Sequence, residues 1–404
     1  MRTFGMSLAA ALLLAGPLSP PAAAQSTDGE SSRAAIVERS QADKSTKLRP
    51  YVPSGFEMAV TRVEKTMLNG TMKWLPFLEG AYTGAGFSPG VGYMTHVSPY
   101  STLDVRGNVS IRNYKVAEAE FISPRLFHRR AELSVVGGWR EATQVGFYGI
   151  GPNSTTANRA DFAFEQPYAG ARFKVKPTRR LWVLGGGADV ARWSFNDPTG
   201  TAPSVDSVYT PATLPGLGVT TTFVHSQATV GFDWRPAQAY ARRGGFYSIT
   251  AHDYTDNDSR FGFRRVDYRV TQHFPILRES WVLSLNGQAS ATFNKDGQQV
   301  PFYMLPYLGG GSNLRGYSSH RFRDRDSVLI QGEWRIMVNR FMDTAVFYDA
   351  GKVASQHSEM DFHGMRTDYG FGARFHTPFA TALRIDVARS TEGTRLVFAT
   401  SSAF

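Results

Sequence analysis

The sequence predicts an all-β protein, a transmembrane antiparallel β-barrel of about sixteen strands. Two observations lead to this fold class. From residue 73 to residue 404, apolar and polar residues alternate in runs of about 10 to 13 residues, the length that a tilted strand needs to cross a bilayer. Beyond the N-terminus, no stretch approaches the roughly 18 to 20 uninterrupted apolar residues of a spanning helix, so a membrane protein with this sequence crosses with strands.

Residues 1–24 have the features of a cleaved secretory signal peptide. Arg2 supplies a short positive region, residues 8–15 form an apolar segment, and Ala22, Ala23 and Ala24 precede Gln25 as a small-residue cleavage site. The apolar segment is too short to span a membrane, and prolines interrupt it. We therefore expect the mature chain to leave the cytoplasm and to reside in the outer membrane of a Gram-negative cell.

Residues 25–72 are predicted to form a periplasmic linker. Small polar and charged residues dominate up to Lys47, and the proline-containing segment 49–53 favours an extended backbone. Met58, Val63 and Met67 lie at roughly helical spacing, so the linker carries one short amphipathic helix or is a mobile tether. The barrel domain is expected at residues 73–404.

Within the barrel region, the alternation separates two chemically different faces. At residues 281–293, Trp281, Leu283 and Leu285 alternate with Ser284 and Asn286. A soluble sandwich also alternates, but its strands usually have only about 5 to 6 residues. An even number of strands lets the first and last pair antiparallel and close the sheet, so that no backbone polar group faces lipid unpaired. The candidate strands begin near Lys73, Gly86, Ser101, Lys115, Arg130, Phe162, Arg180, His225, Arg243, Gly262, Ser280, Asp326, Phe341, Arg366, Phe379 and Thr394.

The longest connections between these strands, at about residues 148–161, 194–224 and 294–325, fall on one rim of the predicted barrel. Short turns on one side and long loops on the other are typical of outer-membrane barrels. The last residue, Phe404, agrees with this class because such barrels commonly end on an aromatic residue at the membrane interface. We therefore expect Phe404 to be a C-terminal barrel signal.

The last long loop contains a distinctive segment, Gly309-Gly310-Gly311-Ser312-Asn313-Leu314-Arg315-Gly316-Tyr317. Residues 331–335 follow within the next strand, and residues 347–351 lie in the strand after it. In this order, and with five strands after the loop, the segment resembles the BamA/TamA family of outer-membrane barrels. This family, also called bacterial surface antigens, includes the two-partner secretion transporters. The resemblance covers about residues 73–404.

The resemblance implies an inward-folded extracellular loop. The family's hallmark is a hydrophobic-Arg-Gly-aromatic tetrad at the tip of the sixth loop, which folds back into the lumen. Its arginine meets acidic residues on the inner wall of the next two strands. In this sequence the tetrad is Leu314, Arg315, Gly316 and Tyr317, and the expected partners of Arg315 are Glu333 and Asp349.

The resemblance also implies a function. It predicts a non-enzymatic, monomeric barrel that assists the insertion or passage of proteins or lipids at the outer membrane. Its expected partners are outer-membrane lipids, lipopolysaccharide and a client protein or lipid. The seam between the strands near Lys73 and Thr394 is the expected moving part.

Two features depart from the family pattern. Members that insert or export proteins usually carry periplasmic polypeptide-transport-associated repeats before the barrel. The segment before residue 73 has no room for one, which puts substrate capture by such repeats in doubt. The last strand, at residues 394–404, ends in small polar residues apart from Phe404, so either its seam with the first strand is loose or the sequence has drifted.

Residue chemistry is compatible with the expected arrangement of the loop. Glu333 shares a strand face with Gln331 and Arg335, opposite apolar residues, so its carboxylate is expected to point into the lumen. The guanidinium of Arg315 presents a planar fork of donors suited to carboxylates. Gly316 suits a chain reversal that a side chain would obstruct. The alternative is a solvated loop arginine, with Glu333 paired to Arg335 or to nothing.

Catalytic and metal-binding functions find less support. The sequence has no cysteine, which excludes thiol catalysis and Cys-ligated metals, and it has no HExxH motif, so no cofactor or metal is expected. Gly86-Phe87-Ser88-Pro89-Gly90 matches the nucleophile elbow G-x-S-x-G, but Pro89 lacks the N–H that would contribute to the oxyanion hole. The alternatives to a transport role are a passive pore or structural barrel and, with little support, a lipid-modifying enzyme. Such an enzyme would use a serine, a histidine and an asparagine on the lipid face. His96, His225, His252 and His273 all lie in or near predicted strands, and no spacing favours one triad.

The net charge of +10 does not indicate nucleic-acid binding, because Lys and Arg are spread along the chain. The densest group, Arg321, Arg323 and Arg325, is interleaved with Asp324 and Asp326. In a secreted barrel, this pattern favours lining of the lumen or contact with lipopolysaccharide.

Overall fold

The computed structural model describes residues 37–40, 42–43, 73–78, 80–177, 182–277, 279–376 and 381–404. The chain forms two units, Met1–Leu68 and Asn69–Phe404. In the first unit, residues 37–40 and 42–43 are helical. The predicted signal peptide and the positions Met58, Val63 and Met67 of the predicted linker helix lie outside the described residues.

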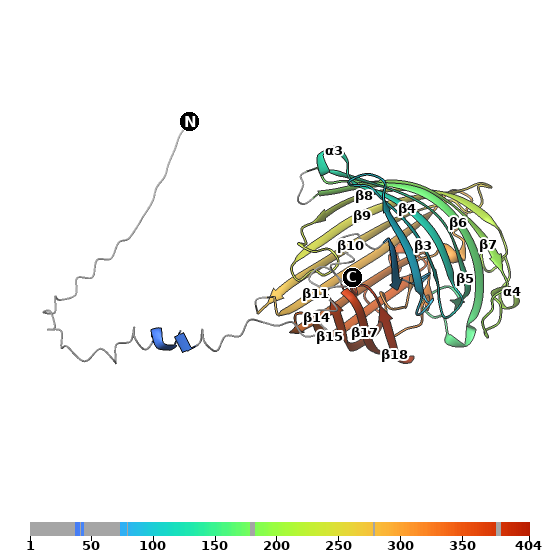
Figure 1. Cartoon of the computed structure of the whole chain (residues 1–404). Helices are drawn as coiled ribbons and strands as arrows, with labels where there is room; N and C mark the ends of the chain where they lie inside the picture. The colour runs from blue at the N-terminus through green and yellow to red at the C-terminus, as the bar shows by residue number, and fades with distance from the viewer. Residues whose placement is uncertain are drawn as a thin grey trace, which may run out of the picture. The chain divides into compact units, whose positions relative to one another are not determined.

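Sixteen strands of the second unit form one antiparallel sheet in chain order (Figure 1). This confirms the predicted fold class and strand number, and each strand begins within four residues of its expected start. The strands are β1 (Trp74–Leu78), β2 (Pro89–His96), β3 (Thr102–Val109), β4 (Lys115–Arg125), β5 (Ala131–Phe147), β6 (Ala160–Val175), β7 (Trp182–Asn196), β8 (Thr221–Asp233), β9 (Gly244–Asp256), β10 (Phe263–Ile276), β11 (Trp281–Asn294), β14 (Asp326–Asn339), β15 (Met342–Ala354), β16 (Arg366–His376), β17 (Thr381–Ser390) and β18 (Gly393–Ala399).

Smaller elements occupy the connections between these strands. A separate two-stranded sheet pairs β12 (Tyr307–Leu308) with β13 (Phe322–Arg323). The short helical segments are α3 (Leu126–Arg129), α4 (Val205–Val208), η1 (Thr156–Asn158), η2 (Phe302–Met304) and η3 (His357–Glu359). None of the helices in the described part of the chain has the length and apolarity to span a membrane.

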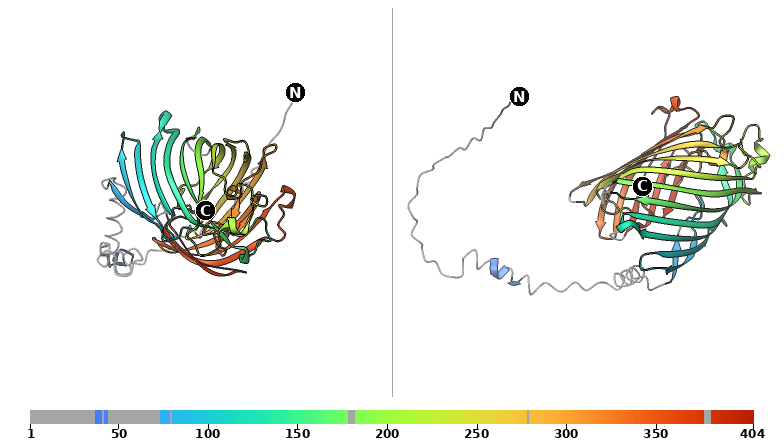
Figure 2. Two further views of the ribbon diagram at one scale, coloured as in Figure 1. Left: turned by 90° about the vertical axis from the view of Figure 1, so that its right-hand side faces the viewer. Right: turned by 90° about the horizontal axis from the view of Figure 1, so that it is seen from above.

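Strand alternation places apolar side chains on the outer face of the sheet and polar ones inside. In β14, Gln331, Glu333 and Arg335 are buried, whereas Ile330 and Trp334 are 42% and 41% exposed. The sheet curves around this polar interior (Figure 2), and lipid is expected to contact its apolar outer face. Exposed apolar residues on other strands include Val105, Val135, Leu184, Val230, Ile249, Val270, Leu285, Val346, Phe371 and Leu396.

The two rims of the sheet differ in their connections. The segments that follow β5, β7 and β11 are long and run over residues 148–159, 197–220 and 295–325. In an antiparallel sheet, these three connections lie on the same rim. On the opposite rim, the segments after β2 and β14 are short. The long loops are therefore grouped as the sequence predicted.

The loop at residues 295–325 folds inward and contacts two walls that are far apart in strand order. One part packs against the inner face of β5 to β8 in a cluster that includes Phe302, Tyr303, Phe147, Phe164, Trp193 and Phe223. Another part packs against β14 and β15 in a cluster of Leu308, Leu314, Tyr317, Phe322, Leu329 and Val353. The loop thus crosses the interior and occupies much of it.

The sheet is not closed, and the prediction that the first and last strands pair was wrong. Among the described residues, β1 pairs with β2 and β18 pairs with β17, and no pairing joins β1 to β18. We call this unpaired edge the open margin. The last strand was expected to reach residue 404 but ends at Ala399. The residues that follow, Thr400, Ser401 and Ser402, are small and polar and favour a turn over a strand.

The C-terminal residue does not continue along the outer face. Phe404 lies beside His273 of β10, with ring centroids 6.4 Å apart. The side chain of His273 is only 4% exposed and lies on the inner face of its strand. The position of Phe404 therefore differs from the expected place at the membrane interface, because the chain turns inward after Ala399.

A charge on the outer face should destabilise the barrel. Ile249 lies near the middle of β9, outward and 52% exposed. We expect Ile249→Arg to lower the free energy of unfolding by about 2 to 4 kcal/mol in a bilayer. The matched control is Thr229→Arg near the middle of β8, because Thr229 lies on the inner face opposite the uncharged Gly185 and Thr250, and its replacement should have little effect. Urea unfolding in liposomes measures both, and equal effects would show that the outer face does not contact lipid.

Candidate functional site

Arg315, at the tip of the inward-folded loop, is completely buried and bound by two carboxylates. Its Nε donates to Asp349 Oδ2 at 2.7 Å and its Nη2 donates to Asp349 Oδ1 at 2.7 Å, which makes a bidentate contact. Its Nη1 donates to Glu333 Oε2 at 2.8 Å. Two of the expected site residues, on β14 and β15, are therefore brought to Arg315 from opposite sides of its guanidinium.

The electrostatic environment of Arg315 favours its charged form. Burial alone would lower the pKa of Arg315, but hydrogen bonds to Asp349 and the charges of Glu333 and Asp386 outweigh burial and raise it. The guanidinium carbon also lies 3.5 Å from the ring centroid of Phe347, a close cation–π contact. Arg315 is thus a permanent cation inside the sheet, held by fixed partners.

The acidic partners of Arg315 are held in turn by further arginines. Arg374 of β16 donates to Glu333 through Nη2 at 2.7 Å and through Nε at 3.2 Å. Arg374 also binds Asp386 of β17, which lies 3.5 Å from Arg315 Nη1. Arg384 Nε is 3.3 Å from Asp386 Oδ2. The result is a buried ion network that joins the loop tip to four neighbouring strands, β14 to β17.

The other members of the tetrad fit tightly around this network. Leu314 is fully buried in the cluster against β14 and β15. The hydroxyl of Tyr317 donates to the carbonyl of Thr367 at 3.2 Å, and its ring packs on Phe322. A Cβ on Gly316 would lie 2.6 Å from Asp368 Cβ. The glycine is thus required by close packing against β16, and its φ is not among the positive ones, so the chain-reversal reason expected from the sequence does not apply.

A chain of amide and hydroxyl contacts extends the site toward β10. Gln331 Nε2 donates to the carbonyl of Asn313 at 2.8 Å and to Asp349 Oδ1 at 3.2 Å. Gln331 Oε1 accepts from Asn286 of β11, whose Oδ1 accepts from Thr271 of β10. These contacts hold the loop backbone and orient Asp349 at the same time.

The basic group at residues 321–325 is divided between the interior and the surface. Arg321 and Arg323 are 3% and 1% exposed, and Arg321 binds Glu392 and Ser154. Arg325 is partly exposed and donates to the carbonyl of Ser355. The first two therefore line the interior, and Arg325 is the most accessible of the three.

Ser88, the candidate nucleophile, is 3% exposed and its hydroxyl donates to the carbonyl of Gly86. Pro89 begins β2. The described residues contain no group of three or more His, Cys, Asp and Glu side chains that could hold a metal ion. The chemistry of the Arg315 site is mutual neutralisation of charges, which suits a clamp.

Sequence reasoning missed Arg374, Arg384, Asp386 and Phe347 as partners. Alternation placed Arg374, Arg384 and Asp386 on the polar faces of their strands, which is the available signal. Their meeting depends on register, in which Arg374 pairs with Arg384 and Gly372 with Asp386. The register between these strands could not be predicted from the sequence.

Removal of the Arg315 guanidinium should destabilise the protein strongly. Arg315→Met leaves Asp349 and part of Glu333 buried without their cation, and we expect the free energy of unfolding to fall by about 3 to 5 kcal/mol. Heat-modifiability on gels and urea unfolding measure the loss. Arg325→Met is the control, because Arg325 is partly exposed and donates to a backbone carbonyl rather than to a buried carboxylate. An equally small change in both variants would contradict a clamp.

Addition of one methyl group at Gly316 should also be destabilising. Gly316→Ala forces its Cβ against Asp368 and Ser390, both closer than 3.0 Å, and we expect a loss of about 1 to 3 kcal/mol. Gly287→Ala in β11 is the matched control, because nothing lies within 4 Å of its would-be Cβ. The same unfolding assay compares them, and equal stability of the two variants would mean that the loop tip does not pack as described.

Comparisons with known proteins place this geometry in context. A model of the Omp85 superfamily domain matches residues 81–398. Among solved structures, BamA from Haemophilus ducreyi lacking POTRA domains 1–3 aligns with a TM-score of 0.57 and 14% identity, over 80% of this chain and 68% of that one. CdiB from Escherichia coli aligns with a TM-score of 0.53 and 9% identity, and CdiB from Acinetobacter baumannii with 0.50 and 12%.

Both CdiB alignments cover 81% of this chain and 59% of the other, so the chain spans less than two thirds of the CdiB length. A search of curated proteins found no match. At these identities, the solved structures show the fold alone. Since the family model accounts for residues 81–398, the chain belongs to the Omp85 superfamily, whose members are outer-membrane β-barrels that act in protein translocation or assembly.

Proposed function

We propose that this protein assists the insertion or passage of proteins or lipids at the outer membrane. In this proposal, the loop held by Arg315 keeps the lumen shut, and the open margin between β1 and β18 provides a lateral route. Family membership supports the general role. The proposed partners are outer-membrane lipids and lipopolysaccharide along the outer face, with a client protein or lipid at the margin, and the barrel acts as a monomer without catalysis.

The observation that carries the proposal is the combination of an anchored loop with an unpaired sheet edge. The loop tip is fixed by buried ion pairs to β14 and β15, so a route along the axis of the barrel meets an obstacle. The outer edges of β1 and β18 have no partner strand among the described residues. An unpaired edge is a template for strand addition, which is the chemistry that a β-rich client needs.

A passive pore is the second candidate. A cavity of about 520 Å³ lies between the loop and the inner wall, and a path through it would conduct ions. Planar-bilayer recording separates the two. We expect rare openings in the unmodified protein and frequent ones in Arg315→Ala, whereas a steady open channel in the unmodified protein would favour the pore.

Closing the open margin by a cross-link should block the proposed activity. The chain has no cysteine, so Phe77→Cys on β1 and Val397→Cys on β18 introduce the only two thiols. We expect the protein in liposomes to accelerate the folding of a urea-unfolded outer-membrane barrel supplied as client. A cleavable bifunctional reagent should abolish that acceleration, and cleavage of the linker should restore it.

The control cross-link joins Tyr93→Cys on β2 to Val105→Cys on β3, which are already paired in the sheet. This link should leave the acceleration unchanged. No acceleration by the unmodified protein, or equal activity with and without the β1 to β18 link, would contradict the lateral route.

A further inference from the structure

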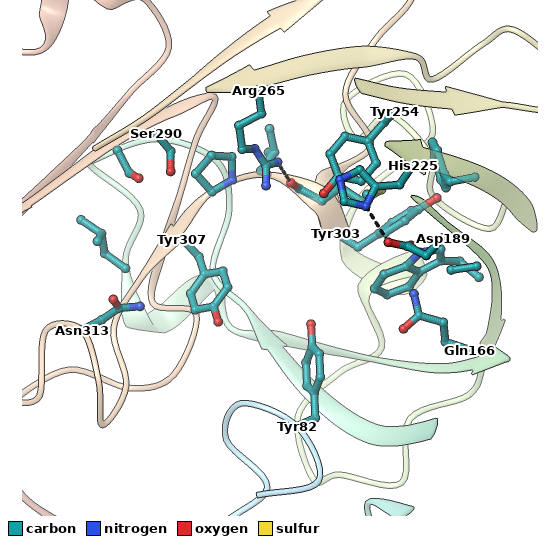
Figure 3. A pocket seen from close by; sticks show the side chains of 18 of the residues that line it. Tyr82, Gln166, Asp189, His225, Tyr254, Arg265, Ser290, Tyr303, Tyr307 and Asn313 are labelled. Atoms are coloured by element: carbon teal, nitrogen blue, oxygen red, sulfur yellow. Dashed lines mark hydrogen bonds and ion pairs between the residues drawn. The ribbon is translucent and has the colours of Figure 1, made fainter. Parts of the chain in front are cut away.

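A row of four titratable side chains crosses the inner wall on the side opposite the ion network. Asp189 Oδ1 lies 2.8 Å from His225 Nδ1, and His225 Nε2 lies 3.0 Å from His252 Nδ1. His252 Nε2 lies 3.2 Å from Asp267 Oδ2. The four residues come one each from β7, β8, β9 and β10, so three short contacts tie four neighbouring strands together. Asp189 and His225 line the interior cavity (Figure 3).

The two imidazole rings meet edge to edge. Their planes differ by 19° and their centroids are 5.2 Å apart, while the two facing nitrogens are only 3.0 Å apart. The nitrogens therefore lie between the centroids, close to the line that joins them. This is the geometry of an N–H···N hydrogen bond in the common plane of the rings. Two ligands of one metal ion would instead point at a third position beside that line.

The number of protons that these contacts need exceeds the number that two neutral histidines carry. An ionised carboxylate only accepts hydrogen bonds, so His225 Nδ1 and His252 Nε2 each hold a proton for Asp189 and Asp267. A neutral imidazole has one N–H, and these two protons use both. Two bare nitrogen lone pairs would then face each other at 3.0 Å, which is repulsive. A third proton between His225 and His252 removes the conflict.

We propose that Asp189, His225, His252 and Asp267 form a binding site for a single proton, shared by the two imidazoles and enclosed by the two carboxylates. The site is independent of the transport role. With the proton bound, all three contacts across β7 to β10 are hydrogen bonds, and the charges of the four side chains sum to one negative. The site is thus a pH-dependent link between β7, β8, β9 and β10, the strands that border the loop.

The groups around the site include both stabilising and opposing neighbours of a bound proton. On β9, the ring of Tyr254 stacks on His225 with centroids 4.1 Å apart and planes 7° apart, which suits a cation over a π face. On β11, Ser290 donates to Asp267 Oδ1 at 2.7 Å and fixes that carboxylate. On β10, the cations Arg265 and Arg269 oppose a bound proton, although each also lies near the carboxylate of Asp267. Arg265 donates to the carbonyl of Met304 in the loop. On β6, the position opposite Asp189 is Gly170, and the cation Arg172, two residues further along the same face, lines the same cavity and opposes a bound proton.

We expect the three hydrogen bonds across β7 to β10 to form together only within a limited range of pH. As pH rises and the shared proton leaves, the central hydrogen bond is lost and two lone pairs meet. As pH falls and a second proton binds, two cationic N–H groups face each other at 3.0 Å and repel. Asp189 and His225 lie in the same cavity as Tyr303 and Tyr307 of the loop, so either change acts on the surface against which the loop packs.

Histidine titration in the full-length protein tests the site. The chain has 9 histidines, and ¹⁵N-histidine labelling in detergent micelles resolves each ring as pH is varied. We expect the signals of His225 and His252 to change together in two steps, because the two rings share the first proton. In His252→Gln, His225 should titrate in one step. His363→Gln is the control, because His363 has a side chain that is 94% exposed and should leave both steps unchanged.

Two results would overturn the proposal. One is independent single-step titration of the two rings in the unmodified protein, with His225 unaffected by His252→Gln. The other is binding of ZnCl₂ at one equivalent per chain, with signal shifts on both rings that His252→Gln abolishes, since this would make the pair a metal site. Two coupled steps without a stoichiometric response to zinc would support the shared proton.

Discussion

One buried guanidinium fixes the path of the loop through the interior. Arg315 is fully buried, so its donors must be matched by acceptors on the protein, and the bidentate carboxylate of Asp349 with Glu333 supplies them. A buried ion pair adds little net stability over an apolar replacement, but loss of one member is costly. The main contribution of Arg315 is therefore to fix the position of the loop tip. It allows one placement of the loop tip, and Leu314 and Gly316 pack closely only in that placement.

The sequence predicted the strands and the polarity of their faces because both depend on local patterns. The alternation of long runs predicted the number of strands, and the resemblance to the BamA/TamA family implied that Arg315 meets Glu333 and Asp349. The contacts of Arg374 and Asp386 could not be predicted from the sequence, because they depend on the register between strands. The same holds for the histidine row, which consists of Asp189, His225, His252 and Asp267. The end of β18 was misjudged for another reason. The strand was expected to continue to residue 404, but Thr400, Ser401 and Ser402 are small and polar and favour a turn.

The interior is organised by three kinds of contact that act on different strands. The ion network holds β14 to β17, the histidine row joins β7 to β10, and aromatic rings such as Phe302 and Phe164 connect the loop to β5 to β8. The loop touches all three, since Arg315 belongs to the first, Tyr303 borders the second, and Phe302 belongs to the third. A structural change at one of these groups of strands therefore has a physical connection to another through the loop, without passing through the sheet between them.

The distribution of these contacts determines where the sheet can open most easily. Separation of β14, β15, β16 or β17 from one another would break buried ion pairs and leave charges unpaired, at a cost of several kcal/mol for each. The network ends on β17 with Arg384 and Asp386. Beyond it, β18 is a strand of only 7 residues, and Arg395 on it makes an exposed contact with Ser318. The strand β1 has 5 residues. Widening at the open margin thus costs few buried polar contacts, and the anchored loop makes the rest of the wall the stiffer part.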